Sequence, residues 1–339
     1  MLEIGPAGTH LPGVTRIGVL RGGGIGDLLL SLPAIQSLAD AYPDAHIVLL
    51  GRENHAELLA GRPGPIHEVQ ILPEPETPEF FAQDFDLVVQ MHGGGKWSNP
   101  FVRKFGARYT IGSRTPDSEP LDRWVPFQFY QQEVMRGLEI AGLAGARPTM
   151  LEPQLTVTGD DLLEASGALT GLAKPVLAVH PGARDRRRCW PAESFVEVIA
   201  AVTEIADVVV VGTDNESEVV DLAQQKEIPV RSLVGELSLP GLVGVLKQAR
   251  VVLANDSGPR HLAQAVGTPT VSIYWMGNVI NAGPHSRALQ RVHISWTTQC
   301  PVCGVDCVHE ETPRCEHEDS FVADVGVPDV LNDVLELLA

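Results

Sequence analysis

The chain contains two successive series of short apolar runs that alternate with helix-like segments, and this pattern constrains its fold more than any other feature. The runs are rich in Val, Ile and Leu and are too short to be buried helices. In the first half they predict strands at residues 17–20, 46–50, 69–72, 87–90 and 109–111. After a stretch marked by prolines at 148 and 153 they predict strands at residues 176–180, 208–211, 230–233, 251–254 and 270–273. Helical periodicity between these later runs predicts helices at residues 192–203, 216–224, 239–248 and 261–266.

Alternation of this kind is typical of parallel sheets with helices on both faces. Because 339 residues are many for one hydrophobic core, two domains are expected. We predict two Rossmann-like open parallel-sheet α/β domains, residues 1–155 and 156–339, facing a central cleft. Ligands are expected at the carboxyl ends of the strands. Residues 1–14, rich in Gly and Pro, are expected to form a loose leader.

The charge and the lack of long apolar stretches narrow the classes of function. A formal net charge of −18 argues against general nucleic-acid binding, which needs a basic face. No apolar run approaches the length that spans a bilayer, and no signal-peptide pattern is present, so the expected location is the cytoplasm. Basic residues nevertheless gather in two places, which suits an anionic substrate held locally. They are Lys96, Arg103, Lys104, Arg108 and Arg114 in the first half, and Arg184, Arg186, Arg187 and Arg188 in the second.

The first motif is the glycine-rich stretch 21–27 (RGGGIGD), directly after the first predicted strand. Its spacing fails as a dinucleotide fingerprint, because Asp27 stands where the third glycine belongs. A carboxylate there would also repel a pyrophosphate at the helix start. Asp27 therefore offers either an acid at the ligand-binding edge of the sheet or a cap for the following helix.

Two further motifs follow strands of the second series. Residues 180–191 (HPGARDRRRCWP) present arginines on a strand-to-helix loop, and the guanidinium fork matches phosphate oxygens. Residues 254–263 (ANDSGPRHLA) run from a buried strand into a helix start, whose free amides and dipole favour anions. Asp256 or Ser257 also fits there as a helix N-cap.

The fourth motif is a cluster of thiols in residues 300–315. Cys300, Cys303, Cys307 and Cys315 are interleaved with histidines, and a C-x-x-C pair brings two thiolates onto one ion. The spacing indicates a structural zinc or iron site, with reduced packing cysteines as the alternative. Disulfides are not expected without an export signal.

Taken together and in this order, the motifs resemble glycosyltransferase family 9, the ADP-heptose:lipopolysaccharide heptosyltransferases. The matching stretches are residues 26–33 (GDLLLSLP), 180–183 (HPGA) with Trp190 and Pro191, 212–216 (GTDNE) and 255–262 (NDSGPRHL). A cysteine-rich segment before the last helix is also seen in many relatives. The resemblance covers the chain from Arg16 onward.

The resemblance implies a GT-B architecture that binds the acceptor on the N-terminal domain and a nucleotide sugar, ADP-heptose in the family, on the C-terminal one. It implies inversion at the anomeric carbon without a catalytic metal, and a lipopolysaccharide-core or related glycan acceptor. Asp27 matches the general base. The positions implied for donor binding are Arg184, Arg187, Arg188, Glu216, Leu237, Asp256, Ser257, Gly258 and His261. Those expected at the acceptor are Gly26, Lys96 and Arg103.

The sequence leaves several points open. The arginine loop is one residue longer than in some heptosyltransferases, so either Arg187 or Arg188 faces the diphosphate. Location at the inner face of the cytoplasmic membrane fits a glycolipid acceptor. The alternative functions are a non-catalytic nucleotide-sugar-binding module of the same fold and an NAD(P)-dependent oxidoreductase, which the broken fingerprint at Asp27 disfavours.

Overall fold

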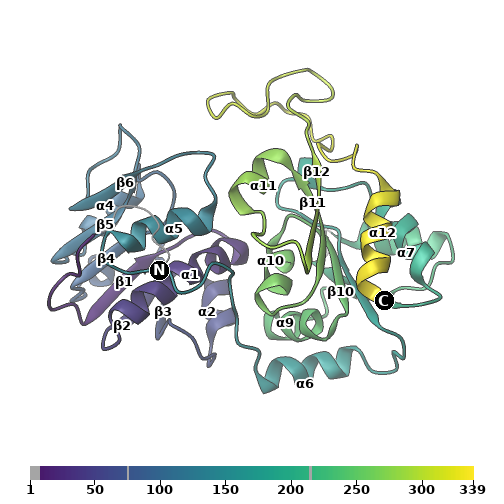
Figure 1. Ribbon diagram of the computed structural model, residues 1–339, viewed down its shortest axis with the longest axis horizontal. Helices are drawn as coiled ribbons and strands as arrows, with labels where there is room; N and C mark the ends of the chain where they lie inside the picture. The colour runs from purple at the N-terminus through teal and green to yellow at the C-terminus, as the bar shows by residue number, and fades with distance from the viewer. Residues whose placement is uncertain (1–7, 75, 214–215) are drawn as a thin grey trace. The chain divides into compact units, whose positions relative to one another are not determined.

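The computed structural model describes residues 8–74, 76–213 and 216–339. The chain divides into two compact units, Met1–Thr156 and Val157–Ala339, and each contains one six-stranded sheet (Figure 1). All strand pairs in both sheets are parallel.

The first unit has the strand order β3-β2-β1-β4-β5-β6. The order reverses between β1 and β4, and the carboxyl ends of these two strands are where sheets of this kind bind ligands. Its elements are β1 (Arg16–Leu20), α1 (Ile25–Ala41), β2 (His46–Gly51), α2 (Glu53–Leu59), β3 (Glu68–Ile71), α3 (Pro78–Phe81), β4 (Leu87–Gln90), α4 (Ser98–Arg103), β5 (Tyr109–Arg114), β6 (Arg123–Pro126) and α5 (Glu133–Gly142).

The second unit repeats the arrangement with the order β12-β11-β10-β7-β8-β9, which reverses between β7 and β10. Its elements are α6 (Gly159–Ala168), β7 (Val176–His180), the 3₁₀ turn η1 (Arg186–Arg188), α7 (Ala192–Val202), β8 (Asp207–Gly212), α8 (Ser217–Gln225), β9 (Arg231–Val234), α9 (Leu239–Gln248), β10 (Val251–Asn255), α10 (Gly258–Ala265), β11 (Thr270–Trp275), α11 (Met276–Ala282), β12 (Gln290–Ser295) and α12 (Val327–Leu338).

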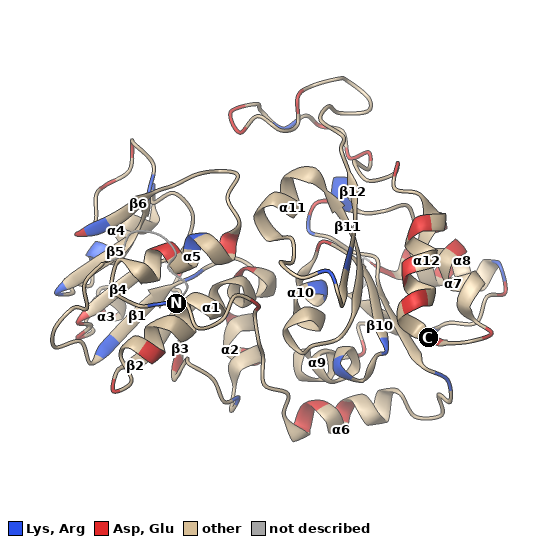
Figure 2. Ribbon diagram, viewed as in Figure 1, with Lys and Arg blue, Asp and Glu red and all other residues tan. Residues whose placement is uncertain are grey.

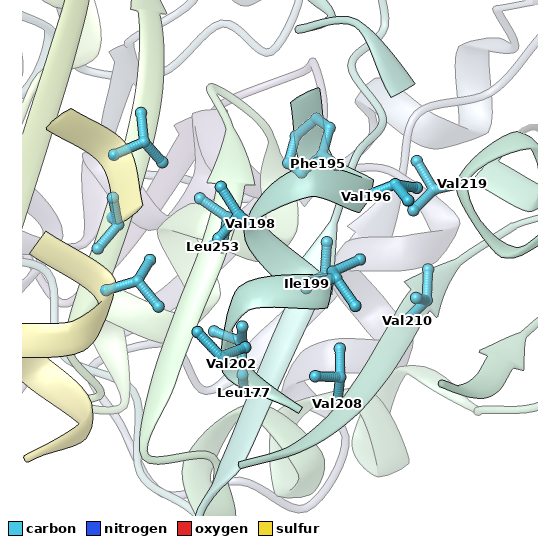
Figure 3. Packing of buried hydrophobic residues seen from close by; sticks show 14 of the residues in the cluster. Leu177, Phe195, Val196, Val198, Ile199, Val202, Val208, Val210, Val219 and Leu253 are labelled. Atoms are coloured by element: carbon cyan, nitrogen blue, oxygen red, sulfur yellow. The ribbon is translucent and has the colours of Figure 1, made fainter. Parts of the chain in front are cut away.

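The core of the second unit forms where α7 packs on the sheet (Figure 3). Phe195, Ile199 and Val202 on α7 are fully buried against strand residues that include Leu177 and Val210. Strands covered on both faces read as continuous apolar runs, as these do. The acidic excess lies partly on helices of this unit, and Figure 2 shows acidic residues, in red on the ribbon, along α6 and α12.

The expected fold class is confirmed, and every predicted strand is present. Two edge strands escaped prediction. β6 contains Arg123 and Pro126, and β12 alternates polar and apolar residues, so neither resembles a fully buried strand. The helix predicted from residue 261 begins earlier, at Gly258.

The expectation of a loose leader was wrong for the part that the structure describes, while residues 1–7 lie outside it. Leu11 is 2% exposed, and its amide donates to the Tyr42 hydroxyl over 2.9 Å. The Gly8 amide donates to the Gly142 carbonyl over 3.0 Å. Apolar burial and these backbone bonds anchor the segment. Among the described residues, no helix is long and apolar enough to cross a bilayer.

Candidate active site

Asp27 lies in the first turn of α1, directly after β1. Gly24 is the N-cap and Asp27 is the third helical residue, so Asp27 caps the helix from the N3 position of a capping box and not as the N-cap itself. Its Oδ2 reaches back and accepts the Gly24 amide over 2.8 Å. A carboxylate at a helix start is stabilised by the helix dipole.

The glycines before α1 make room for this carboxylate. Gly23 has φ +95°, and a Cβ atom there would lie 2.4 Å from Asp27 Oδ2. A side chain at Gly23 would therefore be strained and would collide with Asp27. The close approach that requires glycine here is to the chain's own acid, in keeping with the failed dinucleotide fingerprint.

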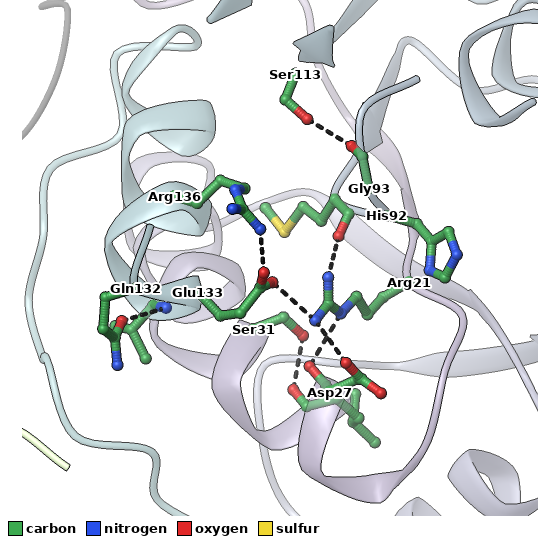
Figure 4. Close-up of polar contacts among 12 residues, drawn as sticks. Arg21, Asp27, Ser31, His92, Gly93, Ser113, Gln132, Glu133 and Arg136 are labelled. Atoms are coloured by element: carbon green, nitrogen blue, oxygen red, sulfur yellow. Dashed lines mark hydrogen bonds and ion pairs between the residues drawn. The ribbon is translucent and has the colours of Figure 1, made fainter. Parts of the chain in front are cut away.

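Arg21 fixes the orientation of Asp27 (Figure 4). Its Nη2 donates to Asp27 Oδ1 over 3.1 Å and to Glu133 Oε2 over 3.0 Å, and its Nε donates to the Asp27 carbonyl over 3.0 Å. Its Nη1 donates to the carbonyl of Met91, just beyond β4, and Glu133 also pairs with Arg136. The side chains of Arg21 and Glu133 are 6% and 19% exposed, whereas that of Asp27 is 42% exposed. The Asp27 carboxylate is thus the accessible end of a buried ion network.

Two histidines that the sequence did not single out stand beside this loop. His55 Nε2 lies 3.3 Å from the Gly24 carbonyl. A Cβ atom on Gly22 would lie 3.2 Å from the His92 ring. Burial lowers the pKa of both rings, so both are neutral near pH 7. Neither has a sequence signature, because their positions depend on β4 and α2 being adjacent to β1 and α1.

The acceptor candidates occupy different surroundings. Gly26 is in α1 beside Asp27. Lys96 is 84% exposed and lies 3.8 Å from Asp117, while Arg103 Nε lies 3.0 Å from Glu119. The partners of both basic residues belong to the loop between β5 and β6. The structure does not link either of them to Asp27.

In the second unit, the arginine loop follows β7 and gives its four arginines separate environments. Arg184 and Arg186 are exposed. Arg187 is held by Asp185 through bonds of 3.0 and 2.7 Å from Nε and Nη2. Arg188 instead reaches the loop after β10, where its Nη1 donates to Asp256 Oδ2 over 3.0 Å. The structure therefore brings Arg188, and not Arg187, to the predicted motif at residues 254–263.

Asp256 is 6% exposed and fully engaged. Besides Arg188, Asn278 Nδ2 donates to its Oδ2 over 2.8 Å, and His261 Nε2 lies 3.3 Å from its Oδ1. Burial alone would raise the pKa of this carboxyl, but the His261 bond and the charges of Arg188 and Arg260 hold it below its usual value. Asp256 is therefore an anion that orients its donors.

The start of α10 keeps its free amides. Ser257 is the N-cap by position, yet its Oγ pairs with His180 Nδ1 over 3.1 Å and no side chain in the described ranges caps the helix. Pro259 has no amide, which leaves those of Gly258 and Arg260 at the helix start. Unpaired amides with the helix dipole make a place for a phosphate.

A buried asparagine ties the two loops together. Asn255 Oδ1 accepts the Trp190 amide over 3.0 Å, and its Nδ2 donates to the Pro181 carbonyl over 2.5 Å. Its side chain is fully buried, so both of its ends are satisfied within the protein. The arginine loop and the α10 start are thus held as one assembly at the point where the strand order reverses.

Glu216 and Leu237 lie farther along the same edge of the sheet, after β8 and β9. Glu216 Oε2 accepts the Thr213 hydroxyl over 2.8 Å. A Cβ atom on Gly182 would lie 2.1 Å from Glu216 Oε1, so that glycine lets the carboxylate approach the loop after β7. Leu237 is half-buried. Residues 214 and 215 of the matching stretch lie outside the described residues.

The cysteine segment forms a cluster that differs from the predicted one. The ligand atoms of Cys300, Cys303, Cys315 and His317 all lie within 4.8 Å of one another. Cys307 is not among them. Its thiol donates to the Val305 carbonyl over 3.4 Å, and its amide is bonded to Thr298. Sequence spacing alone could not place His317 in this set.

Comparison with known proteins agrees with this geometry. A model of glycosyltransferase family 9 (heptosyltransferase) matches residues 80–309. The chain belongs to this family. It is therefore a glycosyltransferase, and the oxidoreductase alternative is set aside. The matched range contains the arginine loop, the α10 start and the first cysteines, while Asp27 lies before it.

Individual relatives support the same assignment. The chain is 25% identical to lipopolysaccharide heptosyltransferase 3 of Escherichia coli over 277 residues, which cover 74% of this chain and 80% of that protein. Its fold is similar to the solved structure of the E. coli ADP-heptose LPS heptosyltransferase II, with TM-score 0.73, 20% identity and coverage of 96% and 98% of the two chains. It is also similar to the iron-containing dodecameric glycosyltransferase TibC of enterotoxigenic E. coli, with TM-score 0.58, 15% identity and coverage of 97% and 77%. These likenesses confirm the expected GT-B class of fold.

Proposed function

We propose that the protein transfers a heptose from ADP-heptose to a lipopolysaccharide-core or related glycan acceptor, with inversion and without a catalytic metal. The donor binds the unit Val157–Ala339 and the acceptor binds the unit Met1–Thr156. The observation that carries the proposal is the pair of prepared sites at the two strand-order reversals: an oriented carboxylate after β1, and arginine with free amides after β7 and β10. ADP-heptose and lipopolysaccharide are named in the relatives, and we infer them for this chain.

The donor diphosphate lies at the start of α10. The amides of Gly258 and Arg260 donate to it, and Arg188 supplies the charge that grows in importance as the diphosphate leaves. Asp256 holds Arg188 in place over 3.0 Å. Preorganised donors aimed at developing charge stabilise the transition state without a divalent ion. Arg187 braces the loop through Asp185, and Glu216 and Leu237 line the nucleoside side.

The reaction is a single displacement. Asp27 accepts the proton of an acceptor hydroxyl while that oxygen bonds to the anomeric carbon. The bond from that carbon to the diphosphate oxygen breaks, and ADP leaves with the bonding electrons. A placed general base contributes roughly 10²–10⁴-fold to the rate. The bond from Arg21 orients the carboxylate, and its exposed fraction leaves it accessible to the acceptor.

Three measurements test this function. Isothermal titration with ADP, UDP and GDP should find ADP bound most tightly. Incubation with ADP-heptose and a heptose-deficient lipopolysaccharide core should release ADP in the presence of EDTA. The NMR coupling at the anomeric carbon of the product should show inversion relative to the donor. ADP binding without turnover on any core acceptor would instead favour the non-catalytic nucleotide-sugar-binding module.

A second candidate function concerns Cys300, Cys303, Cys315 and His317, which fit one tetrahedral zinc or iron ion. The His317 Nδ1 is buried and has no hydrogen-bond partner in the described part of the chain, as expected of an atom meant for a metal. The ion would have a structural role.

Metal analysis tests this second site. Protein purified without chelator should carry about one zinc or iron per chain. Cys315→Ser should lose the ion, and Cys307→Ser is the matched control that should keep it. Equal metal content in the two variants would contradict the assignment.

The proposed transfer reaction also implies a location. Because it uses a nucleotide sugar and a glycolipid, we place the protein in the cytoplasm, at the inner face of the membrane.

A further inference from the structure

Arg260 is a buried charge that the proposed reaction does not yet use. Its side chain is fully buried in α10. Its Nη1 donates to Gln264 over 2.6 Å, its Nε donates to Ser272 over 3.3 Å, and its guanidinium stands 5.5 Å from the Tyr274 ring centre. Among the residues described, no carboxylate is within ion-pair distance of it, and its Nη2 has no hydrogen-bond partner. Burying a guanidinium without a carboxylate is costly, so packing alone does not account for an arginine here.

The contact between Arg260 and the next residue, His261, indicates what Arg260 does. Arg260 Nη1 lies 3.2 Å from His261 Nδ1. A guanidinium is always protonated in proteins and has donors only. The Nδ1 atom must therefore be the acceptor, which means that it carries no proton. The ring is then the neutral tautomer with its proton on Nε2.

This tautomer is the one that Asp256 requires. His261 Nε2 lies 3.3 Å from Asp256 Oδ1, and only a protonated Nε2 can donate to that oxygen. The opposite tautomer would direct a lone pair at the carboxylate. With Oδ1 held by His261, the other oxygen is left for Arg188 and Asn278, at 3.0 and 2.8 Å.

We propose that Arg260 is a positioning residue that fixes the tautomer of His261 and, through Asp256, the orientation of Arg188. Each group in this series of hydrogen bonds orients the next one. Arg260 orients the His261 ring, the ring orients the Asp256 carboxylate, and the other oxygen of that carboxylate accepts from Arg188. The inference rests on the proposed donor site, because it assigns Arg188 to the diphosphate. The tautomer itself is a property of the protein without nucleotide and can be measured separately.

The experiment records long-range ¹H–¹⁵N correlations of histidine-labelled protein without nucleotide, and then titrates ADP. The His261 signals are assigned by their loss in His261→Met. The wild-type ring should show a bare Nδ1 and a protonated Nε2. Arg260→Met has a similar volume and no donor, so its ring should lose this preference and its ADP affinity should fall about tenfold. Arg287→Met, at an exposed position of the same unit, is the control and should change neither.

A second pair of variants tests the same series of hydrogen bonds without altering Arg260. His261→Gln keeps a donor toward Asp256 and an acceptor for Arg260, so its ADP affinity should stay within about threefold of wild type. His261→Met keeps neither and should bind ADP about tenfold more weakly. A protonated Nδ1 in wild type, an unchanged tautomer in Arg260→Met, or equal affinities of the two His261 variants would overturn the inference. Wild-type protein that shows the expected tautomer and binds no ADP would refute the donor site instead.

Discussion

Arg21 donates from one nitrogen, Nη2, to Asp27 over 3.1 Å and to Glu133 over 3.0 Å. The first carboxylate is at the start of α1 and partly exposed, and the second is on α5 and mostly covered. Residues more than a hundred positions apart thus share one buried guanidinium, which fixes the accessible carboxylate against the fold (Figure 4). The orientation of Asp27 is therefore set by α5 as well as by its own helix.

Replacing Arg21 with Met should destabilise the first unit and slow the reaction. The change leaves Glu133 with Arg136 alone and removes the donors from Asp27 and Met91. Loss of one partner from a buried ion network costs about 3–5 kcal/mol. Urea denaturation measures the change in free energy of unfolding. Lys96→Met, which removes an ion pair at 84% exposure, is the control and should change it by less than about 1 kcal/mol. Equal effects of the two variants would contradict the buried network.

Arg188 and Arg186 offer a matched pair for the donor site, two positions apart in one loop. Arg188 contacts Asp256, and Arg186 is exposed. Arg188→Met should raise the Kd for ADP by about tenfold or more, because a charge-assisted bond to phosphate is lost. Arg186→Met should leave it within about twofold. Titration calorimetry measures both Kd values. A weaker affinity in Arg186→Met alone would assign the diphosphate contact to Arg186 instead of Arg188.

Removing the metal should weaken nucleotide binding as well as stability. Residues on both sides of Cys315 brace the arginine loop: the Phe321 amide donates to the Arg187 carbonyl over 2.6 Å, and Arg314 lies 3.5 Å from Asp185. Chelation should lower Tm and raise the Kd for ADP severalfold, since the loop loses its support. Phe321→Ala removes the ring that lies 4.9 Å from the Arg187 guanidinium, and in metal-loaded protein it should reproduce the weaker binding. Chelated protein with wild-type affinity would show that the segment and the loop are independent.

The sequence predicted both sheets because central parallel strands are continuous apolar runs, and this signal is local. It also placed Asp27, Arg188 and Asp256 at strand ends, where the Rossmann-like topology brings them to the ligand-binding edge. It could not distinguish Arg188 from Arg187, because that choice depends on Asp185 and Asp256 side chains meeting in three dimensions. His317 replaced Cys307 for a similar reason: turn geometry, and not spacing, decides which ligands converge.

His180 should make stability depend on pH. Burial lowers its pKa from 6.5 to about 4, with the charge of Glu216 opposing the shift. Between these two pH values His180 is protonated in the unfolded chain and neutral in the folded protein. Its contribution to the free energy of unfolding is therefore complete above pH 6.5 and is lost as the pH falls toward 4. The loss amounts to about 3 kcal/mol. His180→Asn should flatten this part of the curve, measured as Tm at half-unit steps of pH. A variant with the wild-type slope would assign the dependence to other groups.

Asp27→Asn is the decisive variant for catalysis, and the structure shows that it also affects folding. Oδ1 accepts from Arg21 and Oδ2 accepts from Gly24, so both oxygens face donors. An amide keeps one oxygen and turns an NH₂ group toward the other donor. This mismatch should cost about 1–3 kcal/mol of stability. Cap preference alone, which treats Asn and Asp as equivalent, would have predicted almost none.

Comparison with Arg21→Met separates the catalytic effect of Asp27→Asn from its loss of stability. Both variants alter the side-chain contact between residues 21 and 27, but only Asp27→Asn loses the proton acceptor. Its kcat should fall by roughly 10²–10⁴-fold, while ADP affinity, set by the second unit, stays within about twofold. Arg21→Met keeps the carboxylate and should retain at least about tenfold more activity than Asp27→Asn. The measurements are single-turnover transfer and an ADP titration on the folded fraction of each preparation. If folded Asp27→Asn transfers sugar at the wild-type rate, Asp27 is not the base.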